Sequence, residues 1–271
     1  MCGTCGCADG ARIRLLGGDS DARPGSAPGH TRATTAEHTH THGDPGWDSS
    51  VRDGGRRTVV LRQKVLEKND RLAGRNRQWL TERRILAVNL MSSPGAGKTT
   101  LLERTARELR GQLVISVIEG DQETSLDAGR IEAAGCKVVQ INTGAGCHLD
   151  AEMMAAGLRA LDPPAGCVVV IENVGNLVCP ALFDLGEHAK VVLTSVTEGA
   201  DKPIKYPRMF GVADLVVLNK IDLLPYVEFD TTRHAADLAK VSPRADVLQL
   251  SATTGDGLYA WYEWLRSPLT R

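Results

Sequence analysis

The sequence lacks an excess of charge of either sign. It has 32 lysine and arginine residues against 33 aspartate and glutamate residues, for a formal net charge of -1. A surface that binds nucleic acid or an anionic membrane needs a strong basic excess, so this balance argues against both partners. The chain also lacks an apolar run of the roughly 18 residues that a membrane span requires. Its start, Met1-Cys2-Gly3, lacks the basic and then apolar layout of a secretion signal, so we expect a cytoplasmic protein.

Apolar residues are scarce over residues 8–57. Only 11 of these 50 residues belong to the apolar set that makes up 42% of the whole chain. Such a segment buries too little apolar surface to offset the entropy of ordering it, so we expect it to be disordered. The 271 residues then divide into a cysteine-bearing element at 1–7, a disordered tail at 8–57 and one domain at 58–271.

The domain is expected to begin with an amphipathic helix and to continue as an α/β fold. Within residues 58–84, apolar residues and two asparagines recur at steps of three and four residues, which is the period of a helix. The positions that repeat are Leu61, Val65, Leu66, Asn69, Leu72, Asn76, Trp79 and Leu80. Short Val/Ile/Leu runs then alternate with helical stretches such as 99–110 and 150–161. The expected strands span 85–91, 113–119, 137–141, 167–172, 190–196, 215–219 and 247–250. This alternation predicts a doubly wound, mostly parallel sheet flanked by helices, which binds ligands at the carboxyl ends of its strands.

A phosphate-binding loop follows the first strand. Residues 92–100, Ser-Ser-Pro-Gly-Ala-Gly-Lys-Thr-Thr, lie between a strand and a helix, which is the setting of the loop in P-loop NTPases. The glycines let the backbone N–H groups face one anion, and the helix N-terminus adds its dipole. We expect Lys98 to reach the β- and γ-phosphates and the Thr99 hydroxyl to bind Mg²⁺. The expected phosphate-binding residues are Gly95, Ala96, Gly97, Lys98, Thr99 and Thr100.

Two later segments predict that the base is guanine. Asn219-Lys220-Ile221-Asp222 closes an apolar strand. The Asp222 carboxylate can accept hydrogen bonds from both donors on the guanine edge, a pair that adenine does not offer, so it would select GTP over ATP. The Lys220 stem can lie over the base. The segment Ser251, Ala252 and Thr253 follows the last strand and can offer a backbone N–H to the guanine O6.

Two carboxylates complete the set of residues expected to bind Mg²⁺. Glu172 ends one strand and Asp121 follows another, so both are expected to face the phosphates. The alternative roles are a helix cap for Asp121 and a solvated strand end for Glu172. With Lys98 and Thr99 they form the expected catalytic set. No residue stands out to orient the attacking water, and none stands out as an arginine finger, so we expect slow GTP hydrolysis.

The first seven residues carry three thiols, at Cys2, Cys5 and Cys7. Three close thiolates favour a soft or borderline ion such as Ni²⁺, Zn²⁺ or Cu⁺. If Met1 is removed, the α-amine of Cys2 could be a fourth ligand. The alternative is a reactive, oxidation-prone tail. The tail also carries a second candidate metal-binding segment, with histidines at His30, His38, His40 and His42. This segment fits either a metal buffer of low specificity or a polar linker.

The domain itself carries a second candidate metal site. Cys147-His148 follows the strand that ends at residue 141, and Cys179 follows the strand that ends at Glu172. Both segments leave the sheet at the expected nucleotide edge. Two thiolates and an imidazole are one ligand short of a tetrahedral site, which a two-fold dimer could complete. The alternative is a coincidental Cys-His pair. Cys136 and Cys167 are expected to be buried as small apolar residues.

These motifs together resemble the HypB family, GTPases that help to insert nickel into nickel-iron hydrogenase. The resemblance covers nearly the whole chain outside the tail. It rests on the N-terminal cysteines, Asn69-Asp70-Arg71, Asn76-Arg77, and the segments 92–100, 119–121, 143–150, 172–175, 179 and 219–222. The phosphate loop of that family begins with serine, as Ser92 does here.

The resemblance implies a GTP-dependent nickel metallochaperone. It assigns the nickel or zinc ligands of the domain to Cys147, His148 and Cys179, and the Mg²⁺ region to Asp121 and Glu172. It also implies a homodimer that forms around the nucleotide, a HypA-type metallochaperone as partner, and the hydrogenase large-subunit precursor as target.

Two other interpretations stay open at this point. The urease accessory GTPases of the UreG type share the core, but their cysteine lies in a Cys-Pro-His motif, whereas the order here is Cys-His-Leu-Asp. The other interpretation is a nickel or zinc storage protein with a vestigial GTPase. The presence of Lys98, Thr99 and Asp222 argues against it.

Overall fold

The computed structural model of the protein describes residues 12–16, 51–121, 126–144 and 146–267. Contacts divide the chain into two units. The smaller unit comprises residues 18–65, of which the structure describes 51–65, all helical. The larger unit contains every strand that the structure describes and also the candidate site. Among the helices that the structure describes, none combines the length and the apolar character needed to cross a bilayer.

Strands and helices alternate along the larger unit. The strands are β1 (Arg12–Leu16), β2 (Leu86–Ser92), β3 (Ile115–Asp121), β4 (Lys137–Asn142), β5 (Val168–Glu172), β6 (Ala189–Ser195), β7 (Leu215–Asn219) and β8 (Asp246–Gln249). The helices are α1 (Val51–Glu82, which begins in the smaller unit), α2 (Lys98–Glu108), α3 (Leu126–Ala133), α4 (Ala151–Leu161), α5 (Lys202–Lys205), α6 (Pro207–Gly211), α7 (Thr231–Val241) and α8 (Leu258–Arg266). Short 3-10 helices span Pro180–Leu182, Val196–Glu198 and Ile221–Tyr226.

The eight described strands form one sheet in the order β1-β4-β3-β5-β2-β6-β7-β8. All neighbours pair in parallel except β1, which pairs antiparallel with β4. The doubly wound, mostly parallel sheet predicted from the sequence is therefore confirmed. The seven expected strands all form, each within two residues of its expected bounds.

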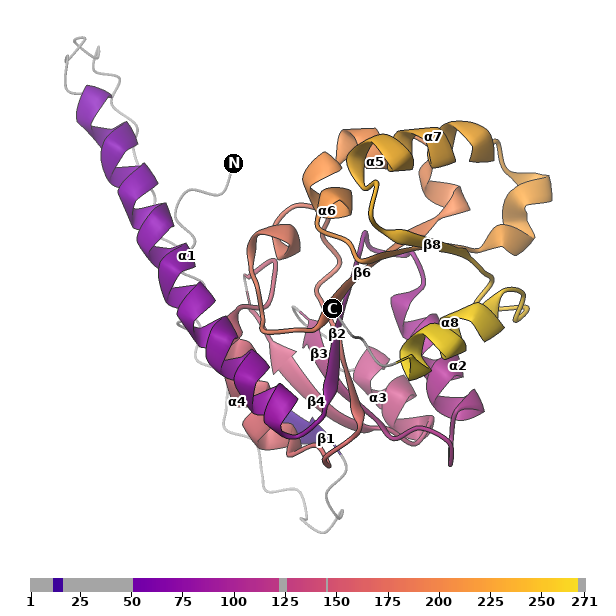
Figure 1. Ribbon diagram of the computed structural model, residues 1–271, viewed down its shortest axis with the longest axis horizontal. Helices are drawn as coiled ribbons and strands as arrows, with labels where there is room; N and C mark the ends of the chain where they lie inside the picture. Colours follow the sequence, from indigo (N-terminus) through magenta and orange to yellow (C-terminus); the bar gives the residue numbers. More distant parts are fainter. Residues whose placement is uncertain (1–11, 17–50, 122–125, 145, 268–271) are drawn as a thin grey trace, which may run out of the picture. The chain divides into compact units, whose positions relative to one another are not determined.

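The central strands β2, β5, β6 and β7 are mostly apolar and buried along their length because both faces of the sheet are covered there. On one face, alternate strand residues such as Val88 and Val170 pack against α2, α3 and α8, where Trp261 is fully buried. On the other face, Ala87 and Val169 pack against α4 and the end of α1, and Val192 and Val216 pack against α6 and α7. Figure 1 shows α2, α3 and α8 gathered on one side of the sheet.

The structure corrects the expected bounds of the disordered tail. Within residues 8–57, residues 12–16 form β1, and α1 begins at Val51 instead of residue 58. Strand β1 forms because Ile13 and Leu15 alternate with charged residues, and because β4 offers an open edge. Residues 8–11 and 17–50 lie outside the described residues, so their expected disorder stays a prediction.

Parallel pairing places the carboxyl ends of β2, β3, β5 and β7 at one edge of the sheet. Ser92, Asp121, Glu172 and Asn219 are the last residues of these four strands. Residues that the sequence separates widely therefore meet at this edge, as expected for a doubly wound fold.

Candidate functional site

A cavity of about 490 Å³ lies at this edge, around the phosphate loop. Its lining comprises Pro94, Gly95, Gly97, Lys98, Thr99, Thr100, Asp121, Asp127, Arg130, Glu172, Val174, Gly175 and Lys220. Helix α2 begins at Lys98, so its first N–H groups point toward the cavity mouth, where an anion is favoured. The volume and the polar lining suit a phosphorylated ligand.

Gly97 brings the phosphate loop close to Asn219, in the segment expected to bind the base. Its φ of 101° lies in the left-handed region, where a side chain is strained. A Cβ atom there would lie 2.5 Å from the side-chain nitrogen of Asn219, so only glycine allows this approach. The loop conformation and its contact with Asn219 both depend on the missing side chain.

Lys98 lies deep in the loop. Its ammonium donates a hydrogen bond of 2.8 Å to the hydroxyl of Ser92. Burial lowers the pKa of Lys98, although the nearby carboxylates of Glu172 and Asp127 act in the opposite direction. A desolvated cation beside backbone N–H groups is the charge arrangement that a polyphosphate would neutralise.

A buried pair of acids lies below the loop. Glu172 accepts a hydrogen bond of 2.8 Å from the Thr99 hydroxyl, and its second oxygen has no partner among the described residues. Burial raises the pKa of Glu172, although the charge of Lys98 opposes this effect. On the adjacent strand Glu119 pairs in register with Glu172, and burial followed by the charge of Glu172 raises the pKa of Glu119 to about 8. Sequence reasoning did not assign Glu119 a role, although an acid inside an apolar strand was a visible signal.

The two segments expected to bind the base meet around Asn219. Its amide nitrogen donates to the Ala96 carbonyl at 2.9 Å, and its oxygen accepts from the Ala252 N–H at 3.0 Å. Lys220 donates to the Gly95 carbonyl at 2.7 Å. One Asp222 carboxylate oxygen is buried and has no partner among the described residues. The structure therefore joins the three segments that the sequence predicted for GTP.

The segment at residues 251–254 is held by its own serine. The Ser251 hydroxyl accepts hydrogen bonds from the N–H groups of Thr253 and Thr254, at 3.3 and 3.0 Å. Ser251 is fully buried. Ser251 therefore holds the shape of this turn from the inside, and a base contact by its side chain is not expected.

The structure also brings Cys147, His148 and Cys179 together. One ligand atom from each lies within 4.8 Å of the others. The Cys147 sulfur lies 3.5 Å from the His148 Nδ1. Two sulfurs and one nitrogen suit a borderline ion such as Ni²⁺ or Zn²⁺, and one protein ligand is missing from a tetrahedral set.

Neighbouring contacts fix the orientation of these side chains. The His148 ring stacks on Phe183 with 4.0 Å between ring centroids. Burial lowers the pKa of His148, although the nearby Asp150 opposes it, so the imidazole is neutral at pH 7 and able to bind a metal. Asn176 accepts hydrogen bonds from the N–H groups of Val178 and Cys179, at 2.7 and 3.3 Å.

Two contacts join this cysteine–histidine cluster to the nucleotide edge. Asn173, which follows Glu172, accepts a hydrogen bond of 3.3 Å from the N–H of Leu149, which follows His148. Leu149 also packs over Gly120, where a Cβ atom would lie 2.8 Å from the Leu149 Cγ. The loop that carries Cys147 and His148 therefore rests directly on the ends of β3 and β5. The sequence did not indicate these contacts.

The other cysteines and the tail histidines are not part of this cluster in the described structure. Cys136 and Cys167 are buried, as predicted, and burial raises the pKa of each thiol to about 11. The predicted N-terminal ligands Cys2, Cys5 and Cys7 and the tail histidines His30, His38, His40 and His42 lie outside the described residues.

Sequence comparisons place the chain among nucleotide-binding proteins. Residues 86–249 match the family described as CobW/HypB/UreG, nucleotide-binding domain. The chain is 44% identical to the hydrogenase maturation factor HypB of Escherichia coli K12, over 98% of this chain and 99% of that protein. It is 52% identical to HypB of Rhizobium leguminosarum bv. viciae, over 79% of this chain and 72% of the relative.

Structural comparison agrees with these matches. HypB of Archaeoglobus fulgidus superposes with a TM-score of 0.70 at 42% identity and covers 76% of this chain and 100% of its own. HypB from Helicobacter pylori in complex with nickel superposes with a TM-score of 0.69 at 37% identity and covers 73% of this chain and 94% of its own. These relatives are all HypB proteins, which favours this family over the urease accessory type. The chain therefore belongs to the HypB family of hydrogenase maturation factors.

Proposed function

We propose that this protein is a GTP-hydrolysing nickel metallochaperone that assists nickel insertion into the hydrogenase large-subunit precursor. The observation that carries the proposal is the Cys147, His148 and Cys179 cluster, whose loop is bonded to the strand ends of a phosphate-loop cavity. Nickel bound there would be sensitive to the state of the nucleotide. The relatives named above, including a HypB structure with nickel, support the same assignment.

The nucleotide is expected to be GTP. The buried, unpaired oxygen of Asp222 would be satisfied by the donor pair of guanine and left unsatisfied by adenine. Lys98 and the α2 N-terminus would hold the phosphates. Arg130 lines the cavity, but its guanidinium is paired with Glu103 at 2.8 Å and Asp127 at 3.5 Å. Because this guanidinium already pairs with two carboxylates in the structure, we assign it no role at the transferred phosphoryl group, and we expect slow intrinsic turnover.

Magnesium fits the oxygen ligands below the loop. The second oxygen of Glu172 is buried without a partner among the described residues, and the Thr99 hydroxyl lies beside the same carboxylate. Carboxylate, hydroxyl and phosphate oxygens are the ligands that Mg²⁺ prefers. Thr99, Asp121 and Glu172 would hold the ion, which would supply positive charge beside the β- and γ-phosphates.

The cluster would need further ligands to enclose nickel or zinc. Three protein ligands are one short of a tetrahedral set, and a second copy of this chain related by a two-fold axis could complete it. We infer a nucleotide-dependent homodimer, a HypA-type metallochaperone as partner, and a cytoplasmic setting. The thiols of Cys2, Cys5 and Cys7 would form a separate nickel site.

The test measures nickel affinity in the full-length chain carrying Cys2→Ser, Cys5→Ser and Cys7→Ser. Affinity is measured with GDP and then with a non-hydrolysable GTP analogue. We expect a several-fold difference, because the cluster loop rests on strand ends that contact the nucleotide. Cys147→Ala should abolish tight binding in both states. Cys136→Ala removes a buried thiol at the opposite edge of the sheet and should change neither affinity.

Equal affinities in the two nucleotide states would contradict the coupling. Absent GTP turnover in the purified protein, together with binding of many metal ions, would instead support a storage protein. By linkage, any factor by which GTP changes nickel affinity must also be the factor by which nickel changes GTP affinity.

A further inference from the structure

The three proposed metal ligands come from two separate segments. Cys147 and His148 lie just before α4, whereas Cys179 precedes the short 3-10 helix Pro180–Leu182, which leads into residues 184–187. Their relative position therefore depends on contacts that hold the two segments together. A metal site with thiols on separate segments is only as well defined as those contacts.

Helix α1 supplies such contacts through Asn69. Its oxygen accepts a hydrogen bond of 2.9 Å from the N–H of Ala151, and its nitrogen donates one of 2.8 Å to the carbonyl of Asp184. Ala151 is the first residue of α4, where an N–H group has no partner within its own helix. One side chain on α1 therefore caps the helix after Cys147-His148 and also binds the segment after Cys179.

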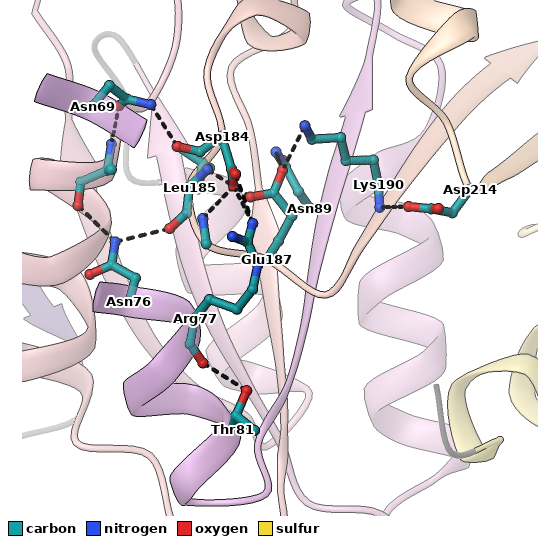
Figure 2. A network of polar contacts seen from close by, with 12 residues as sticks. Asn69, Asn76, Arg77, Thr81, Asn89, Asp184, Leu185, Glu187, Lys190 and Asp214 are labelled. Atoms are coloured by element: carbon teal, nitrogen blue, oxygen red, sulfur yellow. Dashed lines mark hydrogen bonds and ion pairs between the residues drawn. The ribbon is translucent and has the colours of Figure 1, made fainter. Parts of the chain in front are cut away.

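Asn76, two turns further along α1, repeats this bridge. Its nitrogen donates to the carbonyl of Ala151 at 2.8 Å and to the carbonyl of Leu185 at 2.9 Å. Figure 2 shows both asparagines spanning the two segments. The N–H and the carbonyl of Ala151 are each bound to α1, and so are two consecutive carbonyls of the other segment. We refer to Asn69 and Asn76 as the asparagine clamp.

The clamp is buried, with Asn69 5% and Asn76 6% exposed. Four directed bonds to main-chain atoms fix positions in a way that apolar packing does not, because each lost partner leaves a buried polar group unsatisfied. Docking of α1 alone would not need them, since Leu80 on the same helix is fully buried in the core. The arrangement points to control of spacing in addition to attachment of the helix.

The close approach of the helix and the loop supports this interpretation. At Gly186 a Cβ atom would lie 2.5 Å from the carbonyl oxygen of Ala73 on α1. Arg77 binds both oxygens of Asp184 at 2.7 Å. The segment after Cys179 is therefore pressed against α1 at two points beside the clamp.

We propose that Asn69 and Asn76 are positioning residues for the nickel site, and that α1 sets the distance between Cys179 and the Cys147-His148 pair. The inference rests on the proposed function, in which these three residues bind nickel. Loss of the clamp would let the two segments separate. The site would then keep one thiolate and lose the other.

The test uses the full-length chain with Cys2, Cys5 and Cys7 replaced by serine, and compares Asn69→Ala, Asn76→Ala and Asn69→Asp. The aspartate keeps the acceptor for the Ala151 N–H but removes the donor to the Asp184 carbonyl, so of the two Asn69 bonds it breaks only the one to the segment after Cys179. The matched control is Lys68→Ala, which breaks an exposed α1–α4 ion pair with Glu152 and leaves the clamp intact. GTP affinity reports that each variant is folded.

The first readout is nickel itself. We expect about a tenfold or greater loss of affinity in the clamp variants, the range typical of residues that orient metal ligands. The thiolate-to-nickel charge-transfer absorption per bound ion should fall, because one thiolate leaves. Lys68→Ala should stay within twofold of the parent. Unchanged affinity and absorption in all three clamp variants would overturn the proposal.

The second readout needs no metal. A trivalent arsenical bridges two thiols only when they lie close together, so its reaction rate with Cys147 and Cys179 reports their spacing. We expect slower bridging in the clamp variants than in the parent and in Lys68→Ala. If the parent binds no nickel through Cys147, the proposed function fails, and the bridging rate alone decides whether the clamp sets the spacing. Equal bridging rates would then overturn it.

Discussion

The side-chain amide of Asn219 donates a hydrogen bond of 2.9 Å to the carbonyl of Ala96, a residue of the phosphate loop. The other end of the same amide accepts a bond from Ala252, in the segment expected to face the guanine base. Asn219 is almost completely buried. One side chain therefore holds the phosphate loop and the segment expected to face the base in a fixed relation.

Asn219→Ala should weaken GTP and GDP binding alike. The substitution leaves two buried main-chain groups without a partner, each at a cost of about 1–3 kcal/mol. We expect at least a tenfold loss of affinity and a lower melting temperature without nucleotide. Titration with a fluorescent guanine nucleotide measures the first effect. Gln112→Ala, which removes an exposed contact with Arg266, serves as the control. Unaltered binding in Asn219→Ala would show that the bridge is dispensable.

Gly97→Ala should abolish nucleotide binding. The added methyl group would lie 2.5 Å from the Asn219 nitrogen, and the backbone φ of 101° is strained for alanine. The phosphate loop must therefore change shape or push Asn219 away. Gly129→Ala on α3 meets nothing within 4 Å and should bind GTP normally. Calorimetric titration of both variants gives the comparison, and tight binding by Gly97→Ala would contradict the loop geometry.

Asp222→Asn should change the base preference. The asparagine replaces a carboxylate oxygen with an amide donor, which suits the carbonyl that xanthine carries where guanine has an amino group. We expect GTP affinity to fall by about two orders of magnitude and XTP affinity to rise. Competition binding measures both. Asp256→Asn, at an exposed carboxylate bonded to Thr254, should keep the preference for GTP.

Glu119→Gln should flatten the pH dependence of stability in the protein free of metal and nucleotide. Burial raises the pKa of Glu119 from 4.5 to about 8, so the folded state binds the proton more tightly than the unfolded chain does. This contribution to stability is complete below pH 4.5 and is lost as the pH rises through 8.

Melting temperatures at pH 5.5 and pH 8.5 test this prediction. We expect Glu119→Gln to melt at a higher temperature than the parent at pH 8.5 and to differ less at pH 5.5. Glu67→Gln, at an exposed position on α1, should follow the parent at both values. A steeper pH dependence in Glu119→Gln would show that the charged form of Glu119 is stabilised in the fold.

Most of the fold followed from sequence pattern because the strands are buried on both faces. Continuous apolar runs such as those of β5 and β7 are hard to mistake. The parallel topology then placed Lys98, Glu172 and Asn219 at one edge without further information. The cysteine–histidine cluster followed from the same rule, because Cys147 and Cys179 each follow a strand that ends there.

The remaining features depend on partners far apart in the sequence. Asn69 and Asn76 repeat with the apolar positions of α1, which marks them as buried, but their partners near residues 151 and 184 carry no sequence signal because they are main-chain atoms. Glu119 gains its high pKa from a neighbour on another strand. Strand β1 was missed because its residues lie within a segment of low apolar content.

Strand β1 also bears on how the metal sites can be separated by experiment. It covers the outer edge of β4, from Leu16 opposite Val138 to Arg12 opposite Asn142. A chain cut after residue 16 would present the unpaired main-chain groups of β4 to other copies, and such bare edges pair with one another. Strand β1 therefore occupies main-chain groups of β4 that would otherwise be open to pairing with another copy. If a chain without β1 aggregates, the exposed edge of β4 explains the aggregation. The metal bound by such a sample would then be a property of the aggregate and could not be assigned to the cysteine–histidine cluster.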